Sequence, residues 1–154
     1  MMWGSNDVED TVTRARTITG AARAVARLAK QVEVALGPLD LSLPQYRVLA
    51  LLGEGSTASS VLARRLAVSP PSVTAVVDGL VGRGLVERQA DPEDRRRLTL
   101  LLTRDGTKLL AAADAAAEAR LGEIAGYFDE PPTGLDLWNL ALDRNREARL
   151  EQGK

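Results

Sequence analysis

Three consecutive arginines, Arg95, Arg96 and Arg97, form the densest cationic group in the chain. They follow the acidic segment 91–94, in which a proline favours a turn. Arginines on a protruding turn can enter the narrow minor groove of DNA, where the potential is most negative. The neighbouring carboxylates leave a second interpretation open, a solvated cluster of surface ion pairs that contributes little.

Small and hydroxyl side chains gather at the start of a predicted helix that runs from Ser69 to about Arg83. Ser69 is a favourable N-cap, and prolines are tolerated in a first helical turn. Such a helix start can approach base edges, and its free amides favour phosphate. The candidate DNA contacts are Ser69, Pro70, Ser72, Val73 and Thr74. Paired helices are common in helical proteins, so this segment alone also fits a purely structural role.

The arginine cluster 95–97 and the helix start at Ser69 are placed by the secondary structure that the hydrophobic periodicity predicts. In chain order we expect helices over 8–36, 44–52, 57–66 and 69–83, strands over 85–89 and 97–102, and helices over 103–128 and 133–150. Ser56 or Thr57 is the expected cap of the third helix, and Thr103 that of the helix after the strands. A helix-turn-helix followed by a basic-tipped hairpin makes a winged helix. We therefore predict a mainly α fold with a small β-hairpin wing, in one domain.

Composition narrows the chemistry that the chain can perform. Its 154 residues are 45% apolar and 27% charged, as in one ordinary soluble domain. There is no cysteine and no histidine, which excludes disulfides, Cys/His metal sites and catalytic triads with histidine. We expect no catalysis, no cofactor, no metal and no membrane segment, and a cytoplasmic location. Residues 57–104 hold eight Lys/Arg against five Asp/Glu, which suits contact with a polyanion.

One motif makes the resemblance to a family specific. Asp94, Arg96 and, five residues later, the pair Leu102-Thr103 match the D-x-R-x-x-x-x-x-L-T pattern of the MarR family of bacterial winged-helix regulators. LSLPQYRVLALL (41–52) and the segment 62–88 also resemble that family, and the similarity covers roughly residues 20–125.

The resemblance implies a homodimer that binds a pseudo-palindromic double-stranded DNA operator. It implies a helical dimerisation region (1–40 and 104–154) and a winged helix-turn-helix lobe (41–103). The recognition helix would enter the major groove and Arg96 the flanking minor groove, with Asp94 holding that arginine in place. The chain departs from the family at Ala75 and Gly79, where many members carry long polar residues.

The resemblance also implies a regulator, more in keeping with a repressor than an activator. Without cysteine or histidine, the remaining effector is a small aromatic or anionic ligand in the crevice between the dimer helices and the lobe, or none. Tyr46 and Arg47 are candidate lining residues, although Tyr46 in the core and Arg47 in solvent is an equal alternative. A winged-helix module that binds proteins without DNA is the other function class; three wing arginines argue against it.

Overall fold

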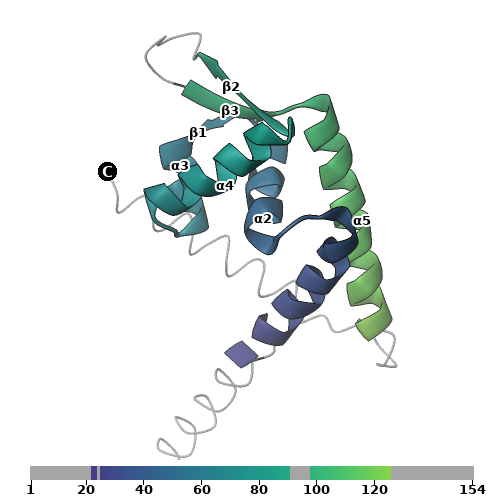
Figure 1. The fold of residues 1–154 in the computed structure, drawn as a ribbon. Helices are drawn as coiled ribbons and strands as arrows, with labels where there is room; N and C mark the ends of the chain where they lie inside the picture. Colours follow the sequence, from purple (N-terminus) through teal and green to yellow (C-terminus); the bar gives the residue numbers. More distant parts are fainter. Residues whose placement is uncertain (1–21, 24, 91–97, 126–154) are drawn as a thin grey trace, which may run out of the picture.

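The computed structural model describes residues 22–23, 25–90 and 98–125 (Figure 1). Its elements are an N-terminal helix (25–36), the 3-10 turn η1 (Gly37–Leu39), α2 (Leu43–Gly53), β1 (Thr57–Ala58), α3 (Ser59–Leu66), α4 (Pro70–Gly82), β2 (Val86–Ala90), β3 (Leu98–Leu102) and α5 (Arg104–Ala125). The predicted mainly helical fold with a small β-hairpin is therefore confirmed. In the described part of the chain, no helix is both long and apolar enough to cross a membrane.

Local signals define most of the helix ends. The N-terminal helix ends at Leu36, as predicted, and the 3-10 turn η1, which was not predicted, begins at Gly37-Pro38. Ser42 begins α2 with a reciprocal capping box, since its hydroxyl accepts from the Gln45 amide while the Gln45 side chain accepts from the Ser42 amide. This cap was not predicted from the sequence.

The sheet contains one strand more than the predicted hairpin. Its three strands are antiparallel in the order β1-β3-β2, and Thr57 of β1 pairs with Leu100 of β3. The expected capping of α3 by Ser56 or Thr57 is wrong, because Thr57 lies in β1 and the N-cap is Ala58, which makes no side-chain cap bond. Two strand residues have no periodicity of their own, so only their pairing with β3 defines them.

The core lies between the helices of the lobe and the inner face of the sheet. Its largest fully buried side chains come from the N-terminal helix, α2, α3, α4, β2 and β3: Leu36, Leu49, Leu62, Leu80, Leu100, Val48, Val73, Val77 and Val86. The apolar side chains of the N-terminal helix are only partly buried in the single chain. Leu36 is fully buried, whereas Val25 is 51% exposed.

Thr103 joins the start of α5 to the turn after α4. Its amide donates to the Leu85 carbonyl, and its hydroxyl donates to the Gly84 carbonyl at 2.7 Å. The same hydroxyl accepts from the Gly106 amide, so the predicted capping role of Thr103 is confirmed. Gly84 itself ends the α4 segment with a φ of 70°, as glycine readily allows.

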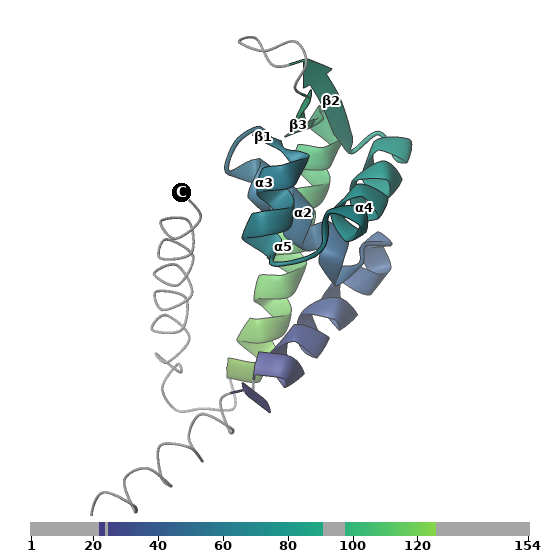
Figure 2. The same ribbon diagram turned by 90° about the vertical axis from the view of Figure 1, so that its left-hand side faces the viewer.

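The N-terminal helix and the distal half of α5 lie side by side, away from α3, α4 and the sheet (Figures 1 and 2). A tertiary contact connects them, since the Arg120 guanidinium donates to the Gln31 side-chain oxygen at 2.7 Å. The expected helix 133–150 and the first part of helix 8–36 lie outside the described residues. The division into a dimerisation region and a lobe remains a prediction.

Candidate nucleic-acid interface

The exposed face of α4 is the main candidate surface for DNA. Ser69 caps the helix, because its hydroxyl accepts from the Ser72 amide, and Pro70 occupies the first turn. The helix lies on the surface of the lobe next to β2 (Figure 2). Its outward side chains are small and leave the backbone open to close approach; they are Pro70, Pro71, Ser72, Thr74, Ala75, Asp78, Gly79 and Gly82.

Four of the five predicted DNA contacts of this helix are exposed, and one is buried. Ser69, Pro70, Ser72 and Thr74 are exposed, as a DNA contact requires. All three hydroxyls already have local partners, since the Ser69 and Ser72 hydroxyls lie 2.7 Å apart and Thr74 donates to the Pro70 carbonyl at 3.0 Å. The Thr74 and Ser72 oxygens can still take part in further hydrogen bonds.

Val73 is a correction to the predicted contacts. Its side chain is only 1% exposed and belongs to the core with Val77 and Leu80. The inward apolar periodicity of α4 therefore decides its position, and its side chain cannot reach a base edge.

Several arginine side chains of the lobe bind carboxylates or carbonyls. Arg88 of β2 donates to Asp78 of α4 at 2.5 Å. Arg65 of α3 pairs with Glu54, and Arg83 donates to the carbonyl of Asp40 at 2.7 Å. The Asp78–Arg88 pair was not predicted from the sequence; the signal for it was that Asp78 is the only charged residue in α4.

The predicted wing residues Asp94, Arg95, Arg96 and Arg97 lie outside the described residues. The strands on either side of them are described, and they pair up to Ala90 and Leu98. The roles of the four residues therefore remain predictions.

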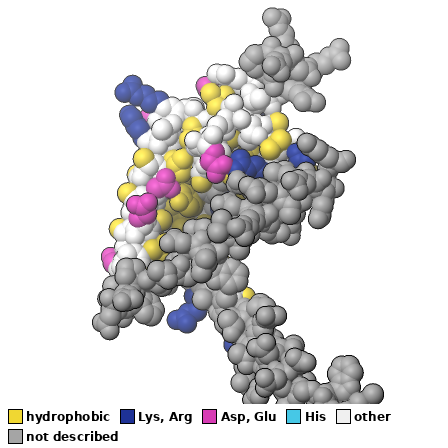
Figure 3. All heavy atoms as spheres, turned by 180° about the vertical axis from the view of Figure 1, so that it is seen from behind, with side chains coloured by type: hydrophobic (Ala, Val, Ile, Leu, Met, Phe, Trp, Pro, Cys, Tyr) yellow, Lys and Arg dark blue, Asp and Glu magenta, His cyan; other side chains and the backbone are white. Residues whose placement is uncertain are grey.

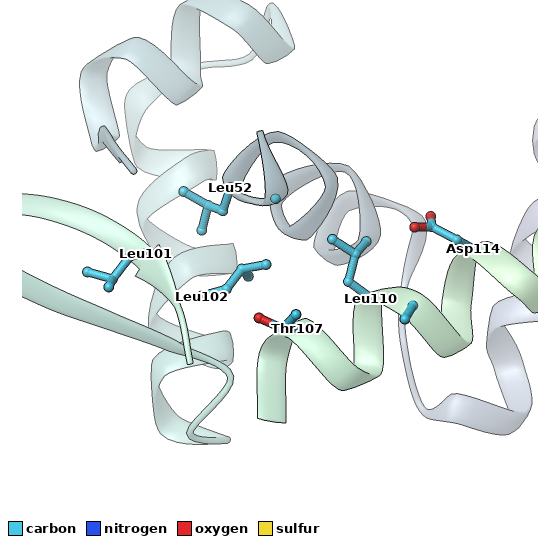
Figure 4. A pocket seen from close by; sticks show the side chains of 8 residues that line it. Leu52, Leu101, Leu102, Thr107, Leu110 and Asp114 are labelled. Atoms are coloured by element: carbon cyan, nitrogen blue, oxygen red, sulfur yellow. The ribbon is translucent and has the colours of Figure 1, made fainter. Parts of the chain in front are cut away.

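A cavity of about 400 Å³ lies between α2, β3 and α5 (Figure 4). Leu52, Leu102 and Leu110 reach it from these three elements (Figure 4), and Thr107 and Asp114 supply side-chain oxygens. Its size falls within the usual range for small-molecule sites, about 300–1,000 Å³. It is lined by Leu52, Gly53, Leu101, Leu102, Thr107, Leu110, Ala111 and Asp114.

Tyr46 and Arg47, the predicted crevice residues, do not line this cavity. Arg47 is directed elsewhere, since its guanidinium donates to the Leu66 carbonyl at 2.9 Å. Tyr46 is half-buried beside the cavity, and its hydroxyl donates to the Asp114 carboxylate at 2.7 Å. Burial, this hydrogen bond and the charges of Asp114 and Glu118 raise the pKa of Tyr46 to about 12. Asp114, which sequence reasoning did not single out, thus connects Tyr46 to the cavity.

Comparisons with known proteins relate this chain to helix-turn-helix transcriptional regulators. The sequence model of the MarR family matches residues 39–97. The HTH-type transcriptional regulator YhbI of Bacillus subtilis is 35% identical over 113 residues, which cover 72% of this chain and 71% of YhbI. The HTH-type transcriptional repressor Rv2887 of Mycobacterium tuberculosis is 37% identical over 110 residues, 71% of this chain and 79% of the repressor.

Solved structures extend this similarity to three dimensions. CouR from Rhodococcus jostii RHA1, bound to p-coumaroyl-CoA, has a TM-score of 0.68 at 29% identity, covering 83% of this chain and 87% of CouR. Rv2887 in complex with salicylic acid has a TM-score of 0.64 at 29% identity, covering 80% of this chain and 91% of that one.

Proposed function

The chain belongs to the MarR family of DNA-binding transcriptional regulators, and from this premise we propose that it is a repressor that binds a pseudo-palindromic operator as a homodimer. The observation that carries this proposal is the outward face of α4, which is small and hydroxyl-bearing next to the paired strands β2 and β3. A helix with such a face fits the major groove, and a hairpin beside it can reach the flanking minor groove.

The homodimer is supported by apolar surface on the N-terminal helix. Val25 is 51% exposed and Val34 is 53% exposed in the single chain. Figure 3 shows further hydrophobic side chains, with Asp and Glu side chains beside them, on the face opposite that of Figure 1 and on the side where α5 lies. Apolar surface of this kind favours association with another protein surface. A second copy would place two α4 helices on successive half-sites of one DNA face, about one helical turn apart.

The experiment that tests the DNA function is a selection of genomic fragments with the purified protein at two salt concentrations, followed by footprinting. We expect a protected pseudo-palindrome near a promoter, with weaker binding at the higher salt concentration. Enrichment of no sequence by folded, dimeric protein would contradict the proposal and favour a protein-binding winged helix.

A small effector that releases the operator is the second part of the proposal. Relatives with solved structures bind p-coumaroyl-CoA and salicylic acid, both of which carry aromatic rings. The leucine-lined cavity between α2, β3 and α5 suits an aromatic ring. Of its described lining residues, Asp114 is the one that ionises, so it disfavours a ligand carboxylate and accepts from a ligand hydroxyl or amide. Between the aromatic and anionic classes, the cavity thus favours a neutral aromatic compound.

Calorimetry with a matched pair of ligands tests this preference. Salicylamide, which is neutral, should bind more tightly than salicylate, and Asp114→Asn should reduce the difference between them. Asp105→Asn removes the same charge from the first turn of α5 without lining the cavity, so it should leave the difference unchanged. Tighter binding of salicylate to the wild-type protein would contradict the assigned ligand class.

A further inference from the structure

Asp78 is the only charged residue of α4 and lies on its outward face. It follows Thr74 by one helical turn, so the two side chains share the face that the proposed function directs at DNA. Its neighbours on this face are Ala75, Gly79 and Gly82, none of which extends beyond a methyl group. Asp78 is therefore the side chain that projects furthest from this part of the helix.

A lone carboxylate on such a surface would oppose DNA binding, because the duplex carries about one negative charge per 1.7 Å of its length. Here Arg88 of the adjacent strand β2 donates to the Asp78 carboxylate at 2.5 Å. The side chains are 57% and 37% exposed for Asp78 and Arg88, so the pair lies at the surface. The arginine neutralises the carboxylate and fixes its direction, while the second oxygen of Asp78 has no partner in the described part of the chain.

Two bases present an amino donor in the major groove, adenine and cytosine, and cytosine suits a carboxylate better because adenine places its N7 acceptor beside the donor. Cytosine presents its N4 amino group as a donor in the major groove, and Asp or Glu is the side chain that accepts from it. Guanine and thymine present acceptors at the corresponding edges, so a carboxylate disfavours them.

Resting on the proposed DNA-binding function, we propose that Asp78 reads a cytosine in each half-site and that Arg88 is its positioning residue. The remainder of the outward face contributes hydroxyls and small groups that discriminate less between bases. The ion pair between Asp78 and Arg88 thus contributes to base specificity and also connects α4 to β2.

Selection of operators from a randomised DNA library, followed by competition binding, tests this assignment. The wild-type protein should prefer cytosine at one position of each half-site, by about tenfold over the other bases. Asp78→Ala should abolish that preference alone, and Asp78→Asn should shift it to adenine, because an amide pairs with the adenine edge. Arg88→Gln should weaken the preference without changing the base that is preferred.

Glu54→Gln is the matched control, since it removes a carboxylate from an ion pair with Arg65 outside α4. It should leave every base preference unchanged. Ratios between competing DNAs are measured within one variant, so partial loss of folded protein does not affect them. If Asp78→Ala and Asp78→Asn change affinity for all sequences equally, the assignment is overturned while the DNA-binding function stands. If the wild-type protein selects no sequence, both are overturned.

Discussion

Gly106 sits where α5 passes closest to the turn after α4. A Cβ built on Gly106 would lie 1.9 Å from the Leu85 carbonyl oxygen, and the Leu85 backbone is itself bonded to Thr103. Backbone atoms on both sides leave little freedom to move apart. The close approach of the two elements therefore depends on glycine at this one position.

Gly106→Ala should lower the free energy of unfolding by about 1–3 kcal/mol, as overpacking of a dense site does. Gly122→Ala in the same helix is the control, because nothing lies within 4 Å of its added Cβ. Alanine there should be neutral or stabilise by up to about 1 kcal/mol through helix propensity. Urea denaturation monitored by circular dichroism measures both variants, and equal stabilities would contradict the steric role of Leu85.

Tyr46 gives a second expectation, from its pKa. Burial and the hydrogen bond to Asp114 raise this pKa from 10.0 to about 12, so the folded state favours the neutral phenol. The resulting stabilisation is complete below pH 10 and is lost as the pH rises toward 12. In the Tyr127→Phe variant, ultraviolet absorbance reports Tyr46 alone, since the chain has two tyrosines. Ionisation of Tyr46 near pH 10 in the folded variant would show that the bond to Asp114 does not form.

At the scale of elements, the wing carries the predicted cation that contributes most to DNA affinity. Arg96→Ala should weaken binding to all operators and reduce the slope of log affinity against log salt by roughly one charge. Lys30→Ala removes an equal charge from the N-terminal helix, where Lys30 pairs with Glu33, and should leave the slope unchanged. Fluorescence anisotropy measures these slopes. Equal slopes for the wild-type protein and Arg96→Ala would contradict a contact between Arg96 and DNA.

Elements with local signals were predictable from sequence, and elements that depend on distant partners were not. The cap of α4 at Ser69 and its end near Gly84 are set by residues within a few positions, and the structure confirms both. Strand β1 exists only through pairing with β3, more than forty residues later. Val73 shows a conflict between two predictions, where the apolar periodicity of α4 outweighs its position near the helix start.

The same distinction holds in the candidate site. The exposed hydroxyls of α4 followed from the helix period, whereas Asp114 joins Tyr46 across 68 residues of sequence. No local pattern marks that pair. The cavity lies between α2, β3 and α5, whereas Arg47, a predicted lining residue, donates to the Leu66 carbonyl instead.

At the scale of the whole molecule, we expect a dimer at low micromolar concentration by light scattering. Val25→Glu should shift the protein toward monomer, because it places a charge on exposed apolar surface of the N-terminal helix. Val68→Glu is the control, since Val68 is 38% exposed but lies between α3 and α4. A monomeric wild-type protein would contradict the proposed assembly.

The junction at Thr103 has a mechanical consequence for such a dimer. Because α5 is bonded at its first residues to the turn that ends α4, a change in the direction of α5 would be transmitted to α4, the proposed recognition helix. The 22 residues of α5 span about 33 Å. A tilt of about 5° at this junction displaces the far end by roughly 3 Å, and the converse holds for forces applied there. In the proposed dimer, the separation of the two α4 helices would therefore depend on the angle of α5 as well as on the residues proposed to contact DNA.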